Sequence, residues 1–168
     1  MKTKTNNIEV MSPAGSYEAL HAAIKAGANS VYFGVTQLNM RSRSSKNFTL
    51  EDLKKIAKIC SDNDVKSYLT LNTVMYEHDM TLMKKICDTA KKSGVTALII
   101  SDISAMMYAH SIGIEIHIST QANVSNFETV KFYSQFADVI VLARELTLSQ
   151  VKEIVKKIKK EKIEGPNR

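Results

Sequence analysis

Short apolar runs of β type alternate with amphipathic helical runs along the whole chain. Runs typical of strands lie near 8–12, 30–34, 66–72, 97–101, 115–119 and 138–143. Runs with helical periodicity lie near 17–26, 50–63, 79–93, 104–111, 127–136 and 148–160. Six strand–helix units in series predict an α/β fold with a parallel sheet and right-handed crossover connections.

The junctions between these runs carry the residues that helix ends require. Gly27, Gly94 and Gly113 each follow a predicted helix and precede a predicted strand, where a left-handed residue is wanted. Capping-box spacing marks three helix starts, at Thr49 with Asp52, Ser125 with Glu128, and Thr147 with Gln150. Local signals at both ends of the helices therefore support the alternation.

Two architectures fit such a series, an open doubly wound sheet and a (β/α) barrel. The first predicted strand is followed by "SPAGS", and neither the G-x-G-x-x-G fingerprint nor a P-loop is present. This favours a parallel, TIM-barrel-like fold. A complete barrel has eight units and about 250 residues, whereas this chain has 168 residues. We therefore expect one incomplete barrel-like domain over 1–168, with about six of the eight units.

An unclosed barrel would expose its first and last strands as edges. The missing wall would then come from a longer version of the chain or from another chain, and self-association through the open edges is one expectation.

The net charge of +6 is concentrated near the end of the sequence. Residues 147–168 contain seven basic and three acidic side chains, so the rest of the chain carries little excess positive charge. A solvated helix face is the favoured interpretation, and contact with an RNA backbone stays open. No apolar run approaches the 18 or more residues of a membrane span, and the N-terminus has no apolar signal segment. We expect a cytoplasmic protein without membrane contact.

Cys60 and Cys87 are the only cysteines. Each lies in a helical pattern among apolar neighbours, which predicts buried free thiols. Two cysteines cannot supply a four-cysteine zinc or iron–sulfur site. We predict no metal site and no cofactor in this chain.

Polar residues follow the predicted strands at their carboxyl ends, where parallel α/β folds place their sites. The candidates are Arg41, Asn72, Asp102, His117, Ser119, Gln121, Arg144 and Glu145. Plainer interpretations stand beside them: Asp102 as a helix cap, His117 as a satisfied core residue, and Arg144 with Glu145 as an ion pair. A triad of Ser119, His117 and Asp102 is not favoured, because no nucleophile-elbow sequence is present.

Linked motifs along nearly the whole chain resemble the collagenase-like peptidase family U32. They are "SPAGSYEALHAAIKAGANSVYFG", "LNMRSRSSKNFTLEDL", "LTLNT", "ALIISD", "IHISTQANVSN" and "VLARELTLSQV". The resemblance implies the barrel-like N-terminal portion of such a protein. The family is named for proteolysis, including collagen degradation. Several members are RNA hydroxylation proteins that act on a tRNA wobble uridine or an rRNA cytidine, with prephenate and iron–sulfur proteins implicated, and others are linked to ubiquinone hydroxylation.

This sequence departs from the family after its last predicted helix, since the next strand and the cluster cysteines are absent. The resemblance therefore implies a chain truncated at its C-terminus relative to the family. An iron–sulfur cluster is expected only in longer members, and this chain alone is expected to be inactive if the cluster is required.

The resemblance favours prephenate-dependent tRNA hydroxylation over two alternatives, a collagenase-like peptidase and a non-catalytic binding or assembly module. Prephenate carries two carboxylates, so Arg41 and Arg144 are expected to clamp an anion, which could instead be an RNA phosphate. The residues expected to orient the substrate are Asn72, Ser119 and Gln121. Those expected to handle protons are Glu145, Asp102 and His117.

Overall fold

The computed structural model describes residues 8–35, 38–40 and 48–166. Its strands are β1 (Met11–Pro13), β2 (Ser30–Phe33), β3 (Lys66–Leu71), β4 (Ala97–Ile100), β5 (Glu115–Ile118) and β6 (Val139–Ile140). Its α-helices are α1 (Tyr17–Lys25), α2 (Leu53–Ser61), α3 (Met80–Ser93), α4 (Ile103–Ser111), α5 (Phe127–Tyr133) and α6 (Leu148–Glu161). Two short 3₁₀ helices are η1 (Glu77–Asp79) and η2 (Thr120–Ala122). The predicted alternation is confirmed.

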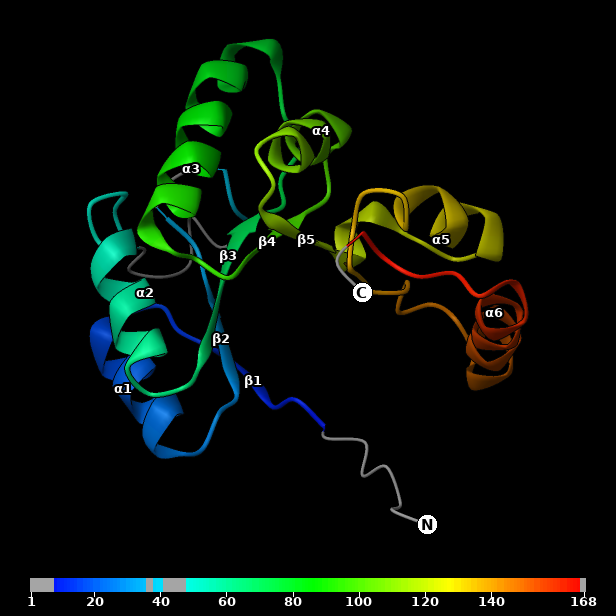
Figure 1. Cartoon of the computed structure of the whole chain (residues 1–168), viewed down its shortest axis with the longest axis horizontal. Coiled ribbons are helices and arrows are strands. Elements are labelled where there is room, and N and C mark those ends of the chain that lie inside the picture. Colours follow the sequence, from blue (N-terminus) through cyan, green and yellow to red (C-terminus); the bar gives the residue numbers. More distant parts are fainter. Residues whose placement is uncertain (1–7, 36–37, 41–47, 167–168) are drawn as a thin grey trace.

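The six strands form one parallel sheet in the order β1-β2-β3-β4-β5-β6. Each strand therefore lies beside its neighbour in the sequence, whereas a doubly wound sheet reverses its strand order at a switch point. The sheet is curled into a half-barrel, and the helices follow the strand order from α1 to α6 (Figure 1). The expectation of an incomplete, TIM-barrel-like fold is confirmed.

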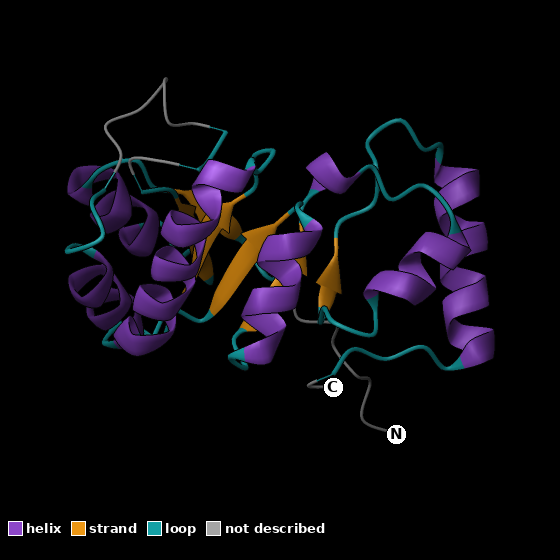
Figure 2. Ribbon diagram, turned by 90° about the horizontal axis from the view of Figure 1, so that it is seen from above, coloured by secondary structure: helices purple, strands orange, loops and turns teal. Residues whose placement is uncertain are grey.

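Side chains alternate between the two faces of the sheet, as period two requires. One face carries Leu69, Leu98 and Ile116, which are fully buried in a core shared with the helices. The opposite face carries Tyr32, Thr70 and Ile99, which line a cavity. Figure 2 shows the strands side by side with the helices running along them. The apolar strands thus build the core with one face and leave the other face for a site.

The three junction glycines adopt the predicted left-handed conformation, with φ of 85° at Gly27, 81° at Gly94 and 68° at Gly113. Because this region strains any residue with a Cβ, glycine sets where these helices end.

The helix starts agree with the capping predictions in full at one of three places and in part at a second. Thr147 and Gln150 form a reciprocal capping box at α6. Thr49 donates its backbone N–H to the Asp52 carboxylate at 2.8 Å, but the N-cap residue of α2 is Asp52, with no side-chain capping hydrogen bond. The box of Ser125 with Glu128 is wrong, because Asn126 caps α5 by accepting the Thr129 N–H at 2.9 Å. An asparagine side chain reaches the N3 amide as well as a serine does, so spacing alone misplaced this cap by one residue.

The outer strands are shorter than predicted. β6 covers only Val139–Ile140, and β1 begins at Met11. Each of them pairs with one neighbour only, so few ladder hydrogen bonds define its length. Pro13 has no N–H to donate and is tolerated at such an edge.

The β1 edge leaves apolar side chains in solvent, with Ile8 85% exposed and Val10 55% exposed. Self-association through this edge stays a prediction. Among the described residues, no helix is long and apolar enough to cross a membrane.

Charged and polar groups near the amino ends of the strands link the segment before β1 to β3, across β2. The Glu9 carboxylate accepts hydrogen bonds from Lys66 Nζ at 2.7 Å and from the Tyr68 hydroxyl at 2.6 Å. Partial burial alone would raise the pKa of Glu9, but the two hydrogen bonds, with further contributions from Ser30 and the positive charge of Lys66, outweigh it and lower the pKa from 4.5 to about 2. Burial, together with the hydrogen bond to this carboxylate, raises the pKa of Tyr68.

This network predicts a loss of stability in acid. Because the pKa of Glu9 is lower in the folded state than in the unfolded chain, its contribution is complete above about pH 4.5 and is lost as the pH falls toward 2. We expect Glu9→Gln to lower the thermal unfolding midpoint at neutral pH and to approach the wild type in acid. Midpoints measured across this pH range test it, with Glu164→Gln as an exposed control. A Glu9→Gln deficit that stays constant down to pH 2 would contradict the prediction.

Candidate functional site

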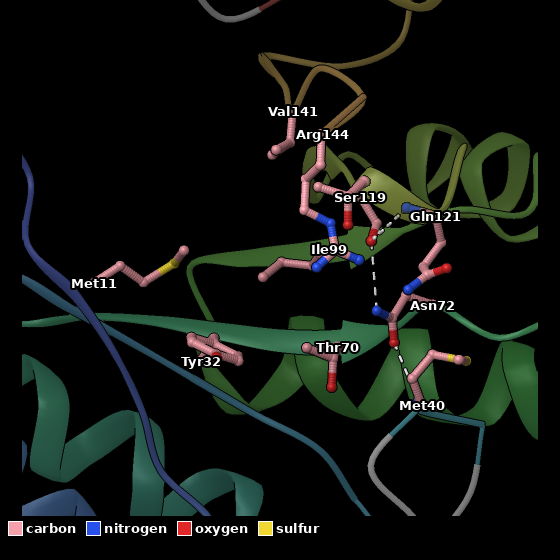
Figure 3. A pocket seen from close by; sticks show the side chains of 11 residues that line it. Met11, Tyr32, Met40, Thr70, Asn72, Ile99, Ser119, Gln121, Val141 and Arg144 are labelled. Atoms are coloured by element: carbon pink, nitrogen blue, oxygen red, sulfur yellow. Dashed lines mark hydrogen bonds between the residues drawn. The ribbon is translucent and has the colours of Figure 1, made fainter. Parts of the chain in front are cut away.

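A cavity of about 390 Å³ lies at the carboxyl ends of the strands, on the face of the sheet opposite the helical core. Figure 3 shows its lining side chains converging from several strands. They are Met11, Tyr32, Met40, Thr70, Asn72, Ile99, Ser119, Thr120, Gln121, Val141 and Arg144. The walls are mainly apolar, and the polar groups are amides, hydroxyls and one guanidinium, as is typical of small-molecule sites.

The strand ends place the polar groups. Asn72 directly follows β3, and Ser119 directly follows β5 and caps η2, which carries Gln121. Arg144 lies four residues beyond the end of β6. In a parallel sheet all these positions fall at one end of the strands. Residues far apart in the sequence therefore meet around one cavity.

Hydrogen bonds connect these groups across the sheet. The Asn72 amide donates to Ser119 Oγ at 3.4 Å, and its oxygen accepts the Met40 N–H at 3.3 Å. Ser119 Oγ also accepts the Gln121 N–H at 3.3 Å. These bonds are longer than the usual N–H···O range and are therefore weak. A ligand could compete for the Asn72 and Ser119 groups at little cost.

Thr70 is held more firmly, because its hydroxyl donates to the Phe33 carbonyl at 3.0 Å. Its proton is therefore not available to a ligand, and Thr70 contributes acceptor capacity and shape to the cavity wall.

Arg144 points into the cavity toward Ile99 and Ser119 (Figure 3). Within the described part of the chain it makes no ion pair, so the Arg144–Glu145 salt bridge of the plainer interpretation is not formed. Arg144 is exposed where it lines this mainly apolar cavity. A guanidinium without a carboxylate partner suits an anionic ligand there, because it pairs bidentately with carboxylate or phosphate.

The structure brings four of the predicted substrate-binding residues together around this cavity, namely Asn72, Ser119, Gln121 and Arg144. Arg41, the fifth, lies outside the described residues. The roles of all five stay predictions.

The three residues predicted to handle protons do not line the cavity. Asp102 caps α4 and accepts the Ser104 N–H at 2.8 Å. Glu145 is exposed to solvent. His117 lies below Ser119 on the same strand face, with Nε2 2.8 Å from Glu115 Oε1 and its ring 4.6 Å from that of Tyr68. Their catalytic roles also stay predictions.

Several lining residues were not singled out from the sequence, chiefly Met11, Tyr32, Met40, Thr70 and Val141. The alternation of side chains within the strands could have identified some of these residues. Period two places Thr70 on the same face as Asn72, and the register pairs Tyr32 with Tyr68. Reading only the residues after each strand missed the part of the wall that the strands themselves provide.

The residues present do not fit an iron–sulfur cluster. Cys60 and Cys87 are buried in α2 and α3, as predicted. Burial raises the pKa of the Cys60 thiol to about 11 and that of Cys87 to about 12, whereas a cluster ligand must be a thiolate. Among the described residues, no group of three or more His, Cys, Asp or Glu side chains is placed to hold a metal ion.

Comparison with known proteins agrees with the family resemblance of the sequence motifs. The model of Peptidase family U32 matches residues 15–165, which is nearly the whole chain. The chain belongs to peptidase family U32. The resemblance seen in the sequence motifs is therefore confirmed.

Relatives within the U32 family carry two kinds of name. A collagenase of Porphyromonas gingivalis is 59% identical over 161 residues, covering 96% of this chain and 39% of that protein. The tRNA hydroxylation protein P of Helicobacter pylori is 36% identical over 154 residues, covering 90% of this chain and 36% of that protein. The chain thus spans well under half the length of these U32 relatives.

A solved U32 peptidase structure, Mk0906, has the same fold. It superposes with a TM-score of 0.72 at 13% identity, covering 93% of this chain and 68% of that one. At this identity the likeness concerns the fold alone.

Proposed function

We propose that this chain is the ligand-binding half-barrel of a U32 protein of the RNA hydroxylation type. In this proposal the cavity binds a small carboxylate-bearing molecule such as prephenate. The observation that carries it is Arg144, an exposed residue that lines a cavity of about 390 Å³ and whose guanidinium has no acidic partner among the described residues. A cavity of this size suits a small organic molecule. The likeness to tRNA hydroxylation protein P supports the RNA part of the proposal.

Each group in the cavity has a role in this proposal. Arg144 clamps a carboxylate through paired charge-assisted hydrogen bonds. Asn72 and Gln121 orient the ligand with their amides, while Tyr32 and Ile99 cover its apolar part. Because the apolar walls displace water from the ligand, they strengthen the interaction between Arg144 and the carboxylate.

Proton handling stays with the three residues predicted for it, none of which lines the cavity. His117 is the favoured base, because its side chain is only 9% exposed and Glu115 orients its ring. Glu145 and Asp102 stay alternatives; Asp102 would first have to give up its cap on α4. No step is assigned to an iron–sulfur cluster, which we expect only in longer family members. RNA as partner and a cytoplasmic location follow from the same proposal.

Calorimetric titration of the 168-residue chain with prephenate tests the cavity. We expect binding by the prephenate dianion, and binding at least about tenfold weaker by its dimethyl ester, since neither ester group can form a charge-assisted pair with Arg144. Equal affinity for dianion and ester, or no binding of either, would contradict the proposal.

A peptidase is the second candidate, because the P. gingivalis relative at 59% identity is named a collagenase. The side-chain contacts do not favour it. Ser119 bonds to Asn72 and Gln121, His117 pairs with Glu115, and Asp102 bonds to Ser104, so these three residues form no triad. Gelatin cleavage by the purified chain that disappears in His117→Ala would favour the peptidase. The third alternative, a non-catalytic assembly module, stays a prediction that rests on the exposed β1 edge.

A further inference from the structure

The loop 72–79, between β3 and α3, presents two aromatic side chains to solvent. Tyr76 is 62% exposed, and the side chain of His78 is 80% exposed. Met75, between Val74 and Tyr76, packs against the hydrophobic core and anchors the loop. Exposed aromatic rings on an anchored loop at the site end of a fold point to binding rather than to packing.

The two rings are stacked on each other. The Tyr76 and His78 rings are parallel within 2°, with their centroids 5.7 Å apart. Asp79 holds the backbone beneath them: its carboxylate accepts the Tyr76 N–H at 2.9 Å, and its own N–H donates to the Tyr76 carbonyl at 2.8 Å. Its second carboxylate oxygen lies 3.5 Å from His78 Nε2. The two stacked rings therefore form a flat surface that is already held in place before a partner binds.

This surface belongs to the same end of the half-barrel as the cavity. The loop begins at Asn72, which lines the cavity, and leads through η1 into α3. Tyr76 itself is not among the residues that line the cavity. A partner resting on the two rings would thus lie at the same end of the half-barrel as the cavity without filling it.

We propose that Tyr76 and His78 form a stacking platform for an unpaired RNA base beside the cavity. This inference rests on the proposed RNA-linked function and adds where the RNA is held. Unpaired bases in RNA loops are commonly recognised by stacking on aromatic and histidine side chains. Every base has a flat π-face, so such a platform tolerates different sequences. Glu77, exposed between the two rings in the sequence, disfavours a phosphate there, so the contact is with a base and not with the backbone.

A proline-rich peptide is the competing partner. Such peptides dock in grooves between aromatic side chains. The two rings here are stacked against each other, which leaves no groove between them. The geometry therefore favours a base.

The test uses fluorescence anisotropy with a labelled RNA hairpin that has an unpaired loop, and with the fully paired duplex of the same stem. We expect Tyr76→Ala to weaken hairpin binding by about tenfold, since one stacked base contributes roughly 1–3 kcal/mol and 1.4 kcal/mol corresponds to tenfold. Tyr76→Phe, the matched control, is expected to keep the wild-type affinity because it retains the ring. Binding of the duplex is expected to be the same in all three proteins.

Three results would overturn the platform: unchanged hairpin binding by Tyr76→Ala, an equal loss on the duplex, or Tyr76-dependent binding of a proline-rich peptide in place of RNA. Because Tyr76 is exposed, its variants are expected to keep the wild-type unfolding midpoint, which is checked first. Prephenate titration of Tyr76→Ala separates the two proposals. Retained prephenate binding with lost hairpin binding supports the platform, whereas failure of prephenate binding in the wild type counts against the cavity proposal alone.

Discussion

Arg144→Ala is expected to weaken prephenate binding by roughly tenfold to a hundredfold, because a hydrogen bond to a charged group contributes about 1.5–3 kcal/mol. Arg144 reaches into the cavity from the segment after β6, and within the described residues no carboxylate neutralises it. Removing it takes the positive charge out of a mainly apolar cavity and leaves the ligand carboxylate without a partner. Calorimetric titration of wild type and variant under the same salt conditions measures the change.

Two matched variants identify the cause of such a loss. Arg144→Lys keeps the charge but not the planar fork, so we expect an intermediate affinity. Lys152→Ala removes one positive charge from the exposed surface of α6, away from the cavity, and is expected to bind prephenate as the wild type does. An equal loss in Lys152→Ala would show that net charge matters rather than the site. Unchanged affinity in Arg144→Ala would remove Arg144 from the site.

Leu98→Ala is expected to have the largest effect on stability, a loss of about 2–5 kcal/mol, because it empties space at the centre of the core. Leu98 is fully buried in β4 and faces the helices between Leu69 and Ile116 of the adjacent strands. Domains of this kind are stable by only about 5–15 kcal/mol, so the loss is a large fraction of the total. Urea unfolding of the wild type and the variant gives the difference.

The control for this measurement is Ile103→Ala at the first turn of α4. Ile103 is 55% exposed, so its truncation is expected to change stability by only about 0.5 kcal/mol. A Leu98→Ala loss no larger than that of the control would contradict the assignment of the core face.

Local patterns in the sequence predicted most of the fold. The alternation of periods gave the order of strands and helices, and Gly27, Gly94 and Gly113 marked helix ends because only glycine adopts φ values of 68–85° without strain. The absence of phosphate-binding fingerprints favoured a barrel over a doubly wound sheet, and the sequential strand order confirms this. The lengths of β1 and β6 were overestimated, because an edge strand is defined by its one neighbour and not by its own apolar run.

Only part of the candidate site was predicted from the sequence, and the reason is again physical. Position after a strand indicates which end of a parallel sheet a residue occupies, so Asn72, Ser119 and Arg144 were found from the sequence alone. The direction in which a side chain turns depends on partners that are distant in the sequence or compete locally. The Asp102 side chain bonds to Ser104 at the start of α4. Its position after β4 was compatible either with this helix cap or with a place in the site.

The sequence by itself determined the α/β alternation, the helix ends and the end of the sheet that carries polar groups, since these depend on residues a few positions apart. Only the tertiary structure decided which of those groups share one cavity and that Arg144 lacks an acidic partner within the described chain. These arrangements depend on the curl of the sheet and on which loops it brings together. No short stretch of sequence encodes them, because they are properties of contacts between strands far apart in the chain.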